Sequence, residues 1–385
     1  MIPYGRQCIS RDDIDAVNKV LQSDWLTQGP VVPRFEEAVT RYVGAEYGVA
    51  VNSATSALHV ACLALELGPS DILWTSCNTF VASANCAVYC GADVDFIDID
   101  PRTYNIRIDA LKNKLEVANS TNSLPKIIVT VHFAGQSCEM KAIKSLSDKY
   151  GFSVIEDASH AIGARYLGEP VGNCCYSDIT VFSFHPVKII TTGEGGMAVT
   201  NSENHYERML RLRSHGITRD SKYFAGRSTA KWYYQQIELG YNYRMTDIQA
   251  ALGLSQMDRI DQFIASRRRL ALRYNELLSK LDIILPWQHA DCESAWHLYV
   301  IRVVSGQTNV DRGMVFDSLR LEGIGVQVHY IPVHTQPFYQ KRGFRLGDYP
   351  ECEHYYEEAL SLPIFPALTN AEQDKIVIKL YKILS

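Results

Sequence analysis

One lysine in the chain stands in a setting that favours nucleophilic chemistry. Lys188 lies between Val187 and Ile189 in the segment FSFHPVKIITTGEGG. Apolar neighbours remove solvation from an amine and lower its pKa, and a neutral amine attacks carbonyl carbons. The alternative is a surface-loop lysine whose stem covers apolar area. The GEGG turn that follows favours the first interpretation, because glycines let the backbone fold tightly beside a bound group.

Two further segments carry groups that could serve the same site. Asp157 ends the predicted strand FSVIED, and acidic residues at the carboxyl ends of strands in α/β sheets point into the ligand crevice. The alternative is an aspartate that caps the following turn. Thr55 and Ser56 open an apolar helix after a strand that ends at Ser53, where free N–H groups and the helix dipole attract a phosphate. Ordinary N-capping is the alternative there.

Taken together, these groups match one cofactor. Pyridoxal phosphate needs a phosphate anchor, an anion beside its ring nitrogen and an amine for the Schiff base. The sequence offers a helix start at Thr55, a carboxylate at Asp157 and an amine at Lys188, 31 residues after the carboxylate. Neither G-x-x-x-x-G-K-[ST] nor G-x-G-x-x-G occurs, so nucleoside triphosphates and dinucleotides lose their usual sequence support. The pattern therefore predicts pyridoxal phosphate.

Short apolar runs separated by helical segments must position these residues. Such runs are typical of a mostly parallel sheet that is covered on both faces, so the sequence predicts an α/β fold. The helix predicted at 140–150 closes on Gly151 as its C-cap. The seven predicted strands are 47–53, 71–76, 93–100, 126–133, 152–157, 179–184 and 197–200.

The pattern changes near Met245. A long amphipathic helix is predicted from Thr246 to about residue 281, with a break or bend inside it because of its length. A strand at 297–304 follows, and the last helix is predicted to begin at Asn370 as N-cap, with Gln373 at capping-box spacing. We therefore predict an N-terminal arm and large cofactor domain over residues 1–245, and a smaller C-terminal α/β domain over residues 246–385.

Composition excludes several classes of protein. The 385 residues carry a formal charge of −5, with 21% charged and 46% hydrophobic residues, which is ordinary globular composition and gives no reason to expect nucleic-acid binding. The ten cysteines form no C-x-x-C pair, so no metal site is expected and the thiols are expected to be reduced. The start MIPYGRQCIS lacks the pattern of a signal peptide, and no apolar run spans a bilayer. A cytoplasmic protein without membrane contact is expected.

Over essentially its whole length the sequence resembles the DegT/DnrJ/EryC1/StrS family of fold-type-I, pyridoxal-phosphate sugar aminotransferases. The resemblance rests on PYGRQCIS, SDWLTQGP, NSATSALH, VIEDASHAIGA, FSFHPVKIITTGEGG, GYNYRMTDIQAALG and VHYIPVH. It implies a large, mostly parallel seven-stranded sheet domain and a smaller C-terminal α/β domain. The pattern is most similar to that of members that aminate C4 of a UDP-linked 4-keto-6-deoxy-N-acetylhexosamine in pseudaminic acid biosynthesis.

The resemblance implies a role for each matching residue on the cofactor side. Lys188 would form the Schiff base, Asp157 would pair with the pyridine nitrogen, and Phe80 would stack on the ring. Ser183 would join Thr55 and Ser56 at the phosphate. Asn242 would reach the phosphate of the neighbouring subunit, so that a homodimer shares its active sites. His160 stands where many relatives carry glutamine near the ring hydroxyl.

On the substrate side, the resemblance implies a set of residues that line the nucleotide-sugar site. They are Tyr4, Asp24, Trp25, Leu26, Thr27, His329 and Tyr330. The ITTGEGG turn is similar to that of members that act at C4, whereas members that act at C3 tend to carry a tyrosine-glycine-aspartate turn. Members that act as dehydratases replace the lysine by histidine, and this chain keeps Lys188.

The expected activity is amino transfer from L-glutamate to the C4 ketone of the UDP-linked keto sugar, in pseudaminic acid or related surface-glycan biosynthesis. One alternative is the same chemistry on another nucleotide-linked keto sugar, such as a UDP-4-keto sugar for bacillosamine or a dTDP-4-keto-6-deoxyhexose. A second alternative is a protein that binds the cofactor, regulates another process and turns nothing over.

Overall fold

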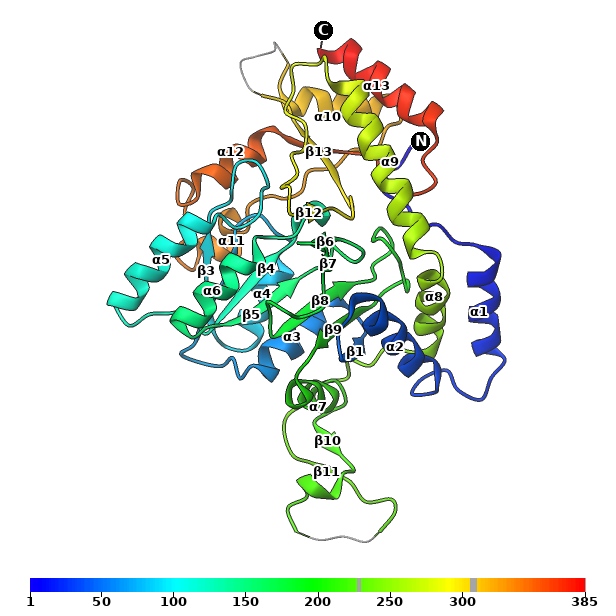
Figure 1. Cartoon of the computed structure of the whole chain (residues 1–385), viewed down its shortest axis with the longest axis vertical. Helices are drawn as coiled ribbons and strands as arrows, with labels where there is room; N and C mark the ends of the chain where they lie inside the picture. Colours follow the sequence, from blue (N-terminus) through cyan, green and yellow to red (C-terminus); the bar gives the residue numbers. More distant parts are fainter. Residues whose placement is uncertain (227–229, 305–309, 385) are drawn as a thin grey trace.

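A seven-stranded sheet forms the centre of the protein in a computed structural model, which describes residues 1–226, 230–304 and 310–384 (Figure 1). All seven strands predicted from the sequence are present, which confirms the α/β fold. In sheet order they are β1 (Tyr47–Val51), β9 (Gly196–Thr200), β8 (Ile179–Ser183), β5 (Ser153–Asp157), β4 (Ile127–Val131), β2 (Ile72–Ser76) and β3 (Asp93–Ile97).

The sheet is mixed but mostly parallel. Only β9 runs against its neighbours, pairing antiparallel with both β1 and β8, while the remaining neighbours pair in parallel. The carboxyl ends of the other six strands therefore meet at one edge, together with the start of β9. Gly196 at that start pairs with both Val51 and Ser183. Ligands of α/β sheets bind at such an edge.

Helices cover both faces of the sheet, and the strands are buried accordingly. Val49 and Val51 of β1 belong to one hydrophobic cluster with Leu58, while Ala50 between them belongs to another with Phe35. Burial on both faces explains the near-continuous apolar runs of the sequence. The covering helices are α2 (Val31–Val43), α3 (Ala54–Ala64), α4 (Ala82–Tyr89), α5 (Ile108–Ser120), α6 (Met140–Tyr150) and α7 (Glu203–Leu212).

Two predicted helix features are confirmed and one is wrong. Helix α6 ends on Gly151, whose φ of 79° is left-handed as its C-cap role requires. The long predicted helix is broken into α8 (Asp247–Met257) and α9 (Ile260–Leu278). The capping box of α13 (Asn370–Leu384) is formed by Thr369 and Glu372, one residue before the predicted pair, because the Thr369 hydroxyl accepts the Glu372 amide at 3.2 Å.

Helices α8 and α9 connect two regions of the molecule. Helix α8 packs on α1 (Arg11–Leu21), where buried Asp13 accepts hydrogen bonds from Gln256 and Arg259. Helix α9 packs into a separate hydrophobic cluster that contains Tyr274 and the N-terminal Ile2. The other elements of that region are β13 (Tyr299–Arg302), β14 (Ala359–Leu362), α10 (Arg312–Leu321) and α12 (Pro350–Glu358). The division into domains at residue 245 remains a prediction.

Several short strands and helices lie outside the central sheet and the long helices. Strands β10 (Ile217–Thr218) and β11 (Gln235–Gln236) form a small hairpin that projects from the end of the molecule away from α13 (Figure 1). Strand β6 (Arg165–Tyr166) joins β7 (Glu169–Pro170) and β12 (Cys292–Glu293). The short helices are η1 (Phe133–Gly135), η2 (Ser221–Tyr223), η3 (Val333–Thr335) and α11 (Pro337–Gln340). Within the described residues, no helix is both long and apolar enough to cross a membrane.

Candidate active site

A cavity of about 410 Å³ opens at the carboxyl edge of the sheet. It is lined from both faces of the sheet, from the N-terminal arm and from the C-terminal region. Nine of the residues predicted from the sequence line it: Tyr4, Thr55, Phe80, Asp157, His160, Ser183, Lys188, His329 and Tyr330.

Lys188 reaches the cavity from the turn after β8, where its amide N–H donates to the carbonyl of His185 at 2.9 Å. The residue is half-buried and its side chain lines the cavity. Burial lowers the pKa of its amine to about 8, although the negative charge of Asp157 acts in the opposite direction. Lys188 is therefore no surface-loop lysine, and a useful fraction of its amine is neutral near pH 7 to 8.

Asp157 combines the two alternatives that its sequence setting left open. Its Oδ1 accepts the amide of Ser159 at 3.1 Å and so caps the following turn. Its Oδ2 accepts the hydroxyl of Ser83 at 2.6 Å, and the carboxylate is 6% exposed at the cavity wall. Ser83, on α4, was not predicted as a site residue, because a contact between residues 74 positions apart leaves no local sequence signal.

The start of α3 offers backbone donors to a bound anion. Ser53 is the N-cap, and its Oγ accepts the amide of Ser56 at 3.1 Å. The amides of Ala54 and Thr55, which line the cavity, remain for a ligand. The structure does not bring Ser56 to the cavity: its side chain is buried and donates to Asn52 Oδ1 at 2.7 Å, so a phosphate contact of its hydroxyl is not supported.

The GEGG turn shapes this end of the cavity. A Cβ on Gly196 would lie 2.5 Å from the amide nitrogen of Ala54, so only glycine lets β9 abut the start of α3. Gly193 has a φ of 81°. The close approach of β9 thus fixes the backbone at the start of α3, which is the predicted phosphate position. With free amides there, and an amine and a carboxylate on the same cavity, the described residues fit pyridoxal phosphate.

Aromatic and imidazole rings form the remaining wall. The hydroxyl of Tyr330 lies 3.1 Å from Nε2 of His160, and the His160 ring centroid lies 4.4 Å from that of His297. Burial lowers the pKa of both imidazoles well below its usual value, and the charge of Lys188 adds to the effect. His329, whose pKa falls to about 3 mainly by burial, is held by Ser361 at 2.8 Å. His297 was not predicted as a site residue, because it begins the strand predicted at 297–304 and nothing in that strand's sequence indicated a functional role.

The structure does not bring every predicted residue to this cavity. The segment between α1 and α2 leaves Trp25 56% and Leu26 48% exposed, and Asp24 beside them is also exposed. Thr27 pairs with Thr246, and Asn242 pairs with Ser214. None of the five lines the cavity of its own chain. Their predicted roles, and the shared site that Asn242 implies, stay predictions.

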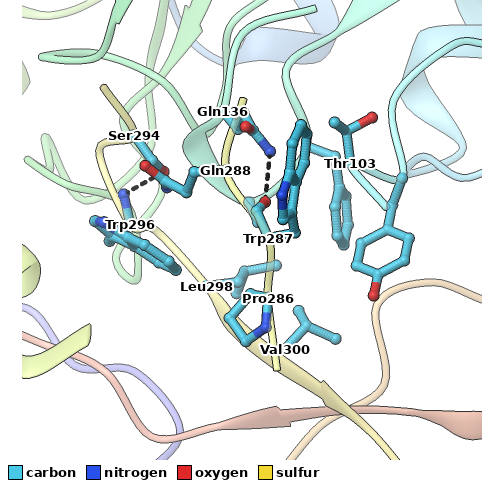
Figure 2. A pocket seen from close by; sticks show the side chains of 12 residues that line it. Thr103, Gln136, Pro286, Trp287, Gln288, Ser294, Trp296, Leu298 and Val300 are labelled. Atoms are coloured by element: carbon cyan, nitrogen blue, oxygen red, sulfur yellow. Dashed lines mark hydrogen bonds between the residues drawn. The ribbon is translucent and has the colours of Figure 1, made fainter. Parts of the chain in front are cut away.

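A second pocket lacks the ionisable residues of the first. It measures about 20 Å³, room for roughly one water molecule. Figure 2 shows Trp287 and Trp296 on its walls, with Gln136 donating to the carbonyl of Trp287 at 3.1 Å. It contains no carboxylate, lysine or histidine. The larger cavity is therefore the candidate active site.

Comparisons with known proteins agree with this assignment. The spore coat polysaccharide biosynthesis protein SpsC of Bacillus subtilis is 38% identical over 379 residues, which are 98% of this chain and 95% of SpsC. The structure of Helicobacter pylori PseC, an aminotransferase involved in the biosynthesis of pseudoaminic acid, matches with a TM-score of 0.91 and 31% identity, covering 100% of this chain and 99% of PseC. The PLP form of Spr1654 from Streptococcus pneumoniae matches with a TM-score of 0.88 and 28% identity, over 100% of both chains.

The sequence profile of the DegT/DnrJ/EryC1/StrS aminotransferase family matches residues 7–381, nearly the whole chain. The fold, the site and the profile agree, and they fix the class of reaction and the cofactor. The protein is a sugar aminotransferase whose cofactor is pyridoxal phosphate. The chain belongs to the DegT/DnrJ/EryC1/StrS aminotransferase family.

Proposed function

We propose that this aminotransferase moves the amino group of L-glutamate to the C4 ketone of a UDP-linked 4-keto-6-deoxy-N-acetylhexosamine, in pseudaminic acid or related surface-glycan biosynthesis. The observation that carries the reaction type is the Lys188 amine, with a pKa near 8, on one cavity with Asp157. The choice of sugar is supported by the ITTGEGG turn and by the similarity to PseC over the whole chain. We also propose a cytoplasmic homodimer.

Pyridoxal phosphate, when bound, supplies the electron sink that stabilises a carbanion beside the transferred nitrogen. The chain's own groups do the rest. The amides at the start of α3, with Thr55 and Ser183, would hold the phosphate. Asp157 would hold the ring nitrogen, while Ser83 and the Ser159 amide fix its carboxylate. Phe80, 58% exposed at the cavity, would cover the ring face.

Lys188 would move the proton in both halves of the reaction. Its amine, once free, would carry the proton between the two carbons on either side of the transferred nitrogen, and it would run this transfer in the opposite direction for the sugar. A group that both accepts and donates a proton works best with a pKa near the working pH. The pKa of about 8 meets that condition, whereas an exposed lysine near 10.5 would stay protonated.

A panel of keto sugars tests the choice of substrate. The cofactor-loaded enzyme is incubated with glutamate and, in turn, the UDP-4-keto-6-deoxy-N-acetylhexosamine of the pseudaminic acid route, the UDP-4-keto sugar for bacillosamine and a dTDP-4-keto-6-deoxyhexose. Mass spectrometry detects the amino sugar, and an enzymatic assay detects 2-oxoglutarate. The highest kcat/KM with the first sugar supports the proposal. A preference for another sugar contradicts it, and no 2-oxoglutarate with any sugar favours a regulatory protein.

A mixing experiment tests the shared site. Lys188→Ala and Asn242→Ala chains are each expected to be nearly inactive. If each site draws on both chains of a homodimer, equal mixing after subunit exchange leaves one intact site in each mixed dimer, so about a quarter of wild-type activity returns. No recovery, despite exchange shown by native mass spectrometry, would contradict the role of Asn242.

A further inference from the structure

Tyr330 holds an unusual position on the cavity wall. Its ring lies 6.2 Å from Phe80 and 6.3 Å from Phe133, centroid to centroid, and its amide donates to Asn78 Oδ1 at 3.2 Å. The ring is therefore fixed on several sides. Burial and the nearby charge of Asp157 raise the pKa of the phenol, so its oxygen keeps its proton at any working pH. The unanswered question is where that proton points.

His160 decides the direction of the hydrogen bond to Tyr330. Burial keeps its imidazole neutral, so the ring carries one N–H. Its Nδ1 is buried and has no partner among the described residues, while its Nε2 lies 3.1 Å from the Tyr330 oxygen. A buried N–H without an acceptor is rarer in proteins than a buried acceptor without a donor. The proton of His160 therefore sits on Nε2 and donates to Tyr330.

His297 does not change this assignment. Its ring lies against that of His160, but its own Nδ1 is likewise buried without a partner in the described chain. Its amide donates to the carbonyl of Ala134 at 2.9 Å, and its carbonyl accepts the buried Arg267 guanidinium at 3.2 Å. Hydrogen bonds to its backbone thus hold His297 in place, and its neutral ring packs on that of His160. It offers no hydrogen bond to Nδ1 of His160.

We propose that His160 commits the Tyr330 hydroxyl to act as a hydrogen-bond donor into the cavity, toward an oxygen of the bound ligand. That oxygen is either the ring oxygen of pyridoxal phosphate or the carbonyl oxygen of the keto sugar. Tyr330 would touch the ligand, and His160 would be a positioning residue that acts through it. His160 itself has no nitrogen left for the ring hydroxyl, which was its expected partner from the family resemblance.

The cofactor arm of the test needs no sugar. The visible absorbance of the pyridoxal-phosphate-loaded enzyme is titrated from pH 5 to 10 for wild type, Tyr330→Phe and the control Tyr381→Phe, whose hydroxyl bonds the distant carbonyl of Leu277. If Tyr330 donates to an anionic oxygen of the cofactor, Tyr330→Phe removes that hydrogen bond. The pH midpoint of the absorbance titration should then rise by about one pH unit. Other groups facing the cavity stay constant across the series: Tyr4, Asp157, His185, Lys188, Glu194, His297 and His329.

The sugar arm measures one turnover of the pyridoxamine-phosphate-loaded enzyme with the keto sugar. A midpoint shift in the first arm assigns the acceptor to the cofactor. An unchanged midpoint with a roughly tenfold slower turnover assigns it to the sugar carbonyl. No effect of Tyr330→Phe in either arm overturns the proposal. The first arm rests on the cofactor alone, so a failure of the proposed sugar substrate would not be mistaken for a failure of this inference.

Substitutions of His160 test its part separately. His160→Gln keeps an N–H donor of similar reach and should match wild type. His160→Leu removes the donor and should reproduce part of the Tyr330→Phe effect, and His160→Asn, too short to reach Tyr330, should do the same. Cofactor stoichiometry and thermal melts identify variants that fold. If the folded leucine or asparagine variant behaves as wild type, His160 does not position Tyr330.

Discussion

The cofactor side of the cavity and its remaining wall are built from different parts of the chain. On the cofactor side, Asp157, Ser183 and Gly196 stand at the ends of strands that are hydrogen-bonded in one sheet, and Ser53 follows β1 as the N-cap of α3. The remaining wall combines Tyr4 of the N-terminal arm with His297, His329 and Tyr330 of the C-terminal region. Its segments are held by hydrogen bonds between loops and side chains and not by the register of the sheet, as in the 3.1 Å bond from the Ile364 amide to the Tyr4 carbonyl.

This difference indicates a division of labour. Strand ends tied by register cannot move independently, which suits the fixed demands of one cofactor. A wall assembled from distant segments can change without disturbing the sheet, which suits a substrate that differs between relatives. We therefore expect substitutions on the cofactor side to affect cofactor binding and all substrates alike. Substitutions on the wall, apart from those of Tyr330 and its partner His160, should affect the sugar.

The largest effect is expected at Lys188. Lys188→Ala removes the residue that we propose as both nucleophile and proton carrier, so turnover with the keto sugar should fall by at least about 10³-fold. Steady-state kinetics measures the loss. The matched control is Lys149→Ala on the exposed end of α6, which should keep wild-type rates. Retained turnover in the Lys188 variant would remove the basis of the proposed chemistry.

A smaller but still large effect is expected at Asp157. Asp157→Asn removes the charge that we propose holds the ring nitrogen, so kcat/KM should fall about 100-fold for every amino donor and keto sugar. Asp148→Asn, an exposed partner of Lys144, is the control. A loss confined to one substrate would show that Asp157 belongs to the sugar side and not to the cofactor side.

A substitution of Gly196, where β9 meets the start of α3, should affect cofactor affinity more than the chemistry. Gly196→Ala places a Cβ 2.5 Å from the Ala54 amide nitrogen, so β9 or α3 must shift. We expect the free energy of unfolding to fall by about 1–3 kcal/mol and the Kd for pyridoxal phosphate to rise about tenfold. Thermal melts and cofactor titration measure both. Gly68→Ala, with nothing within 4 Å of its Cβ, should change neither.

The smallest effect is expected on the wall. Ser361→Ala removes the 2.8 Å hydrogen bond to Nδ1 of His329 and loosens that ring. The KM for the keto sugar should rise a few-fold, roughly what one neutral hydrogen bond contributes, while the Kd for pyridoxal phosphate stays unchanged. Ser279→Ala, at the exposed end of α9, is the control. If the Kd for pyridoxal phosphate rose by the same factor as the KM for the sugar, the proposed division between the two sides would be contradicted.

The residues that could be predicted from the sequence differ from those that could not in the same way. The strands, Asp157, Lys188 and the helix start at Thr55 all follow from local patterns, because periodicity and strand ends determine where such residues lie. Ser83 and His297 depend on contacts between distant segments, which no local pattern records. The direction of the Ser56 side chain, which donates to Asn52, also had no local sequence signal, and its phosphate role stays a prediction.

The central claim is that the half-buried Lys188 amine, with a lowered pKa, carries the chemistry. The most direct test is the rate at which apoenzyme captures pyridoxal phosphate covalently, followed by visible absorbance from pH 6 to 10. Because only the neutral amine attacks, the rate should rise about tenfold per pH unit and level off near pH 8, and Lys188→Ala should capture none. A rate that continues to rise toward pH 10, or capture by the alanine variant, would contradict the account.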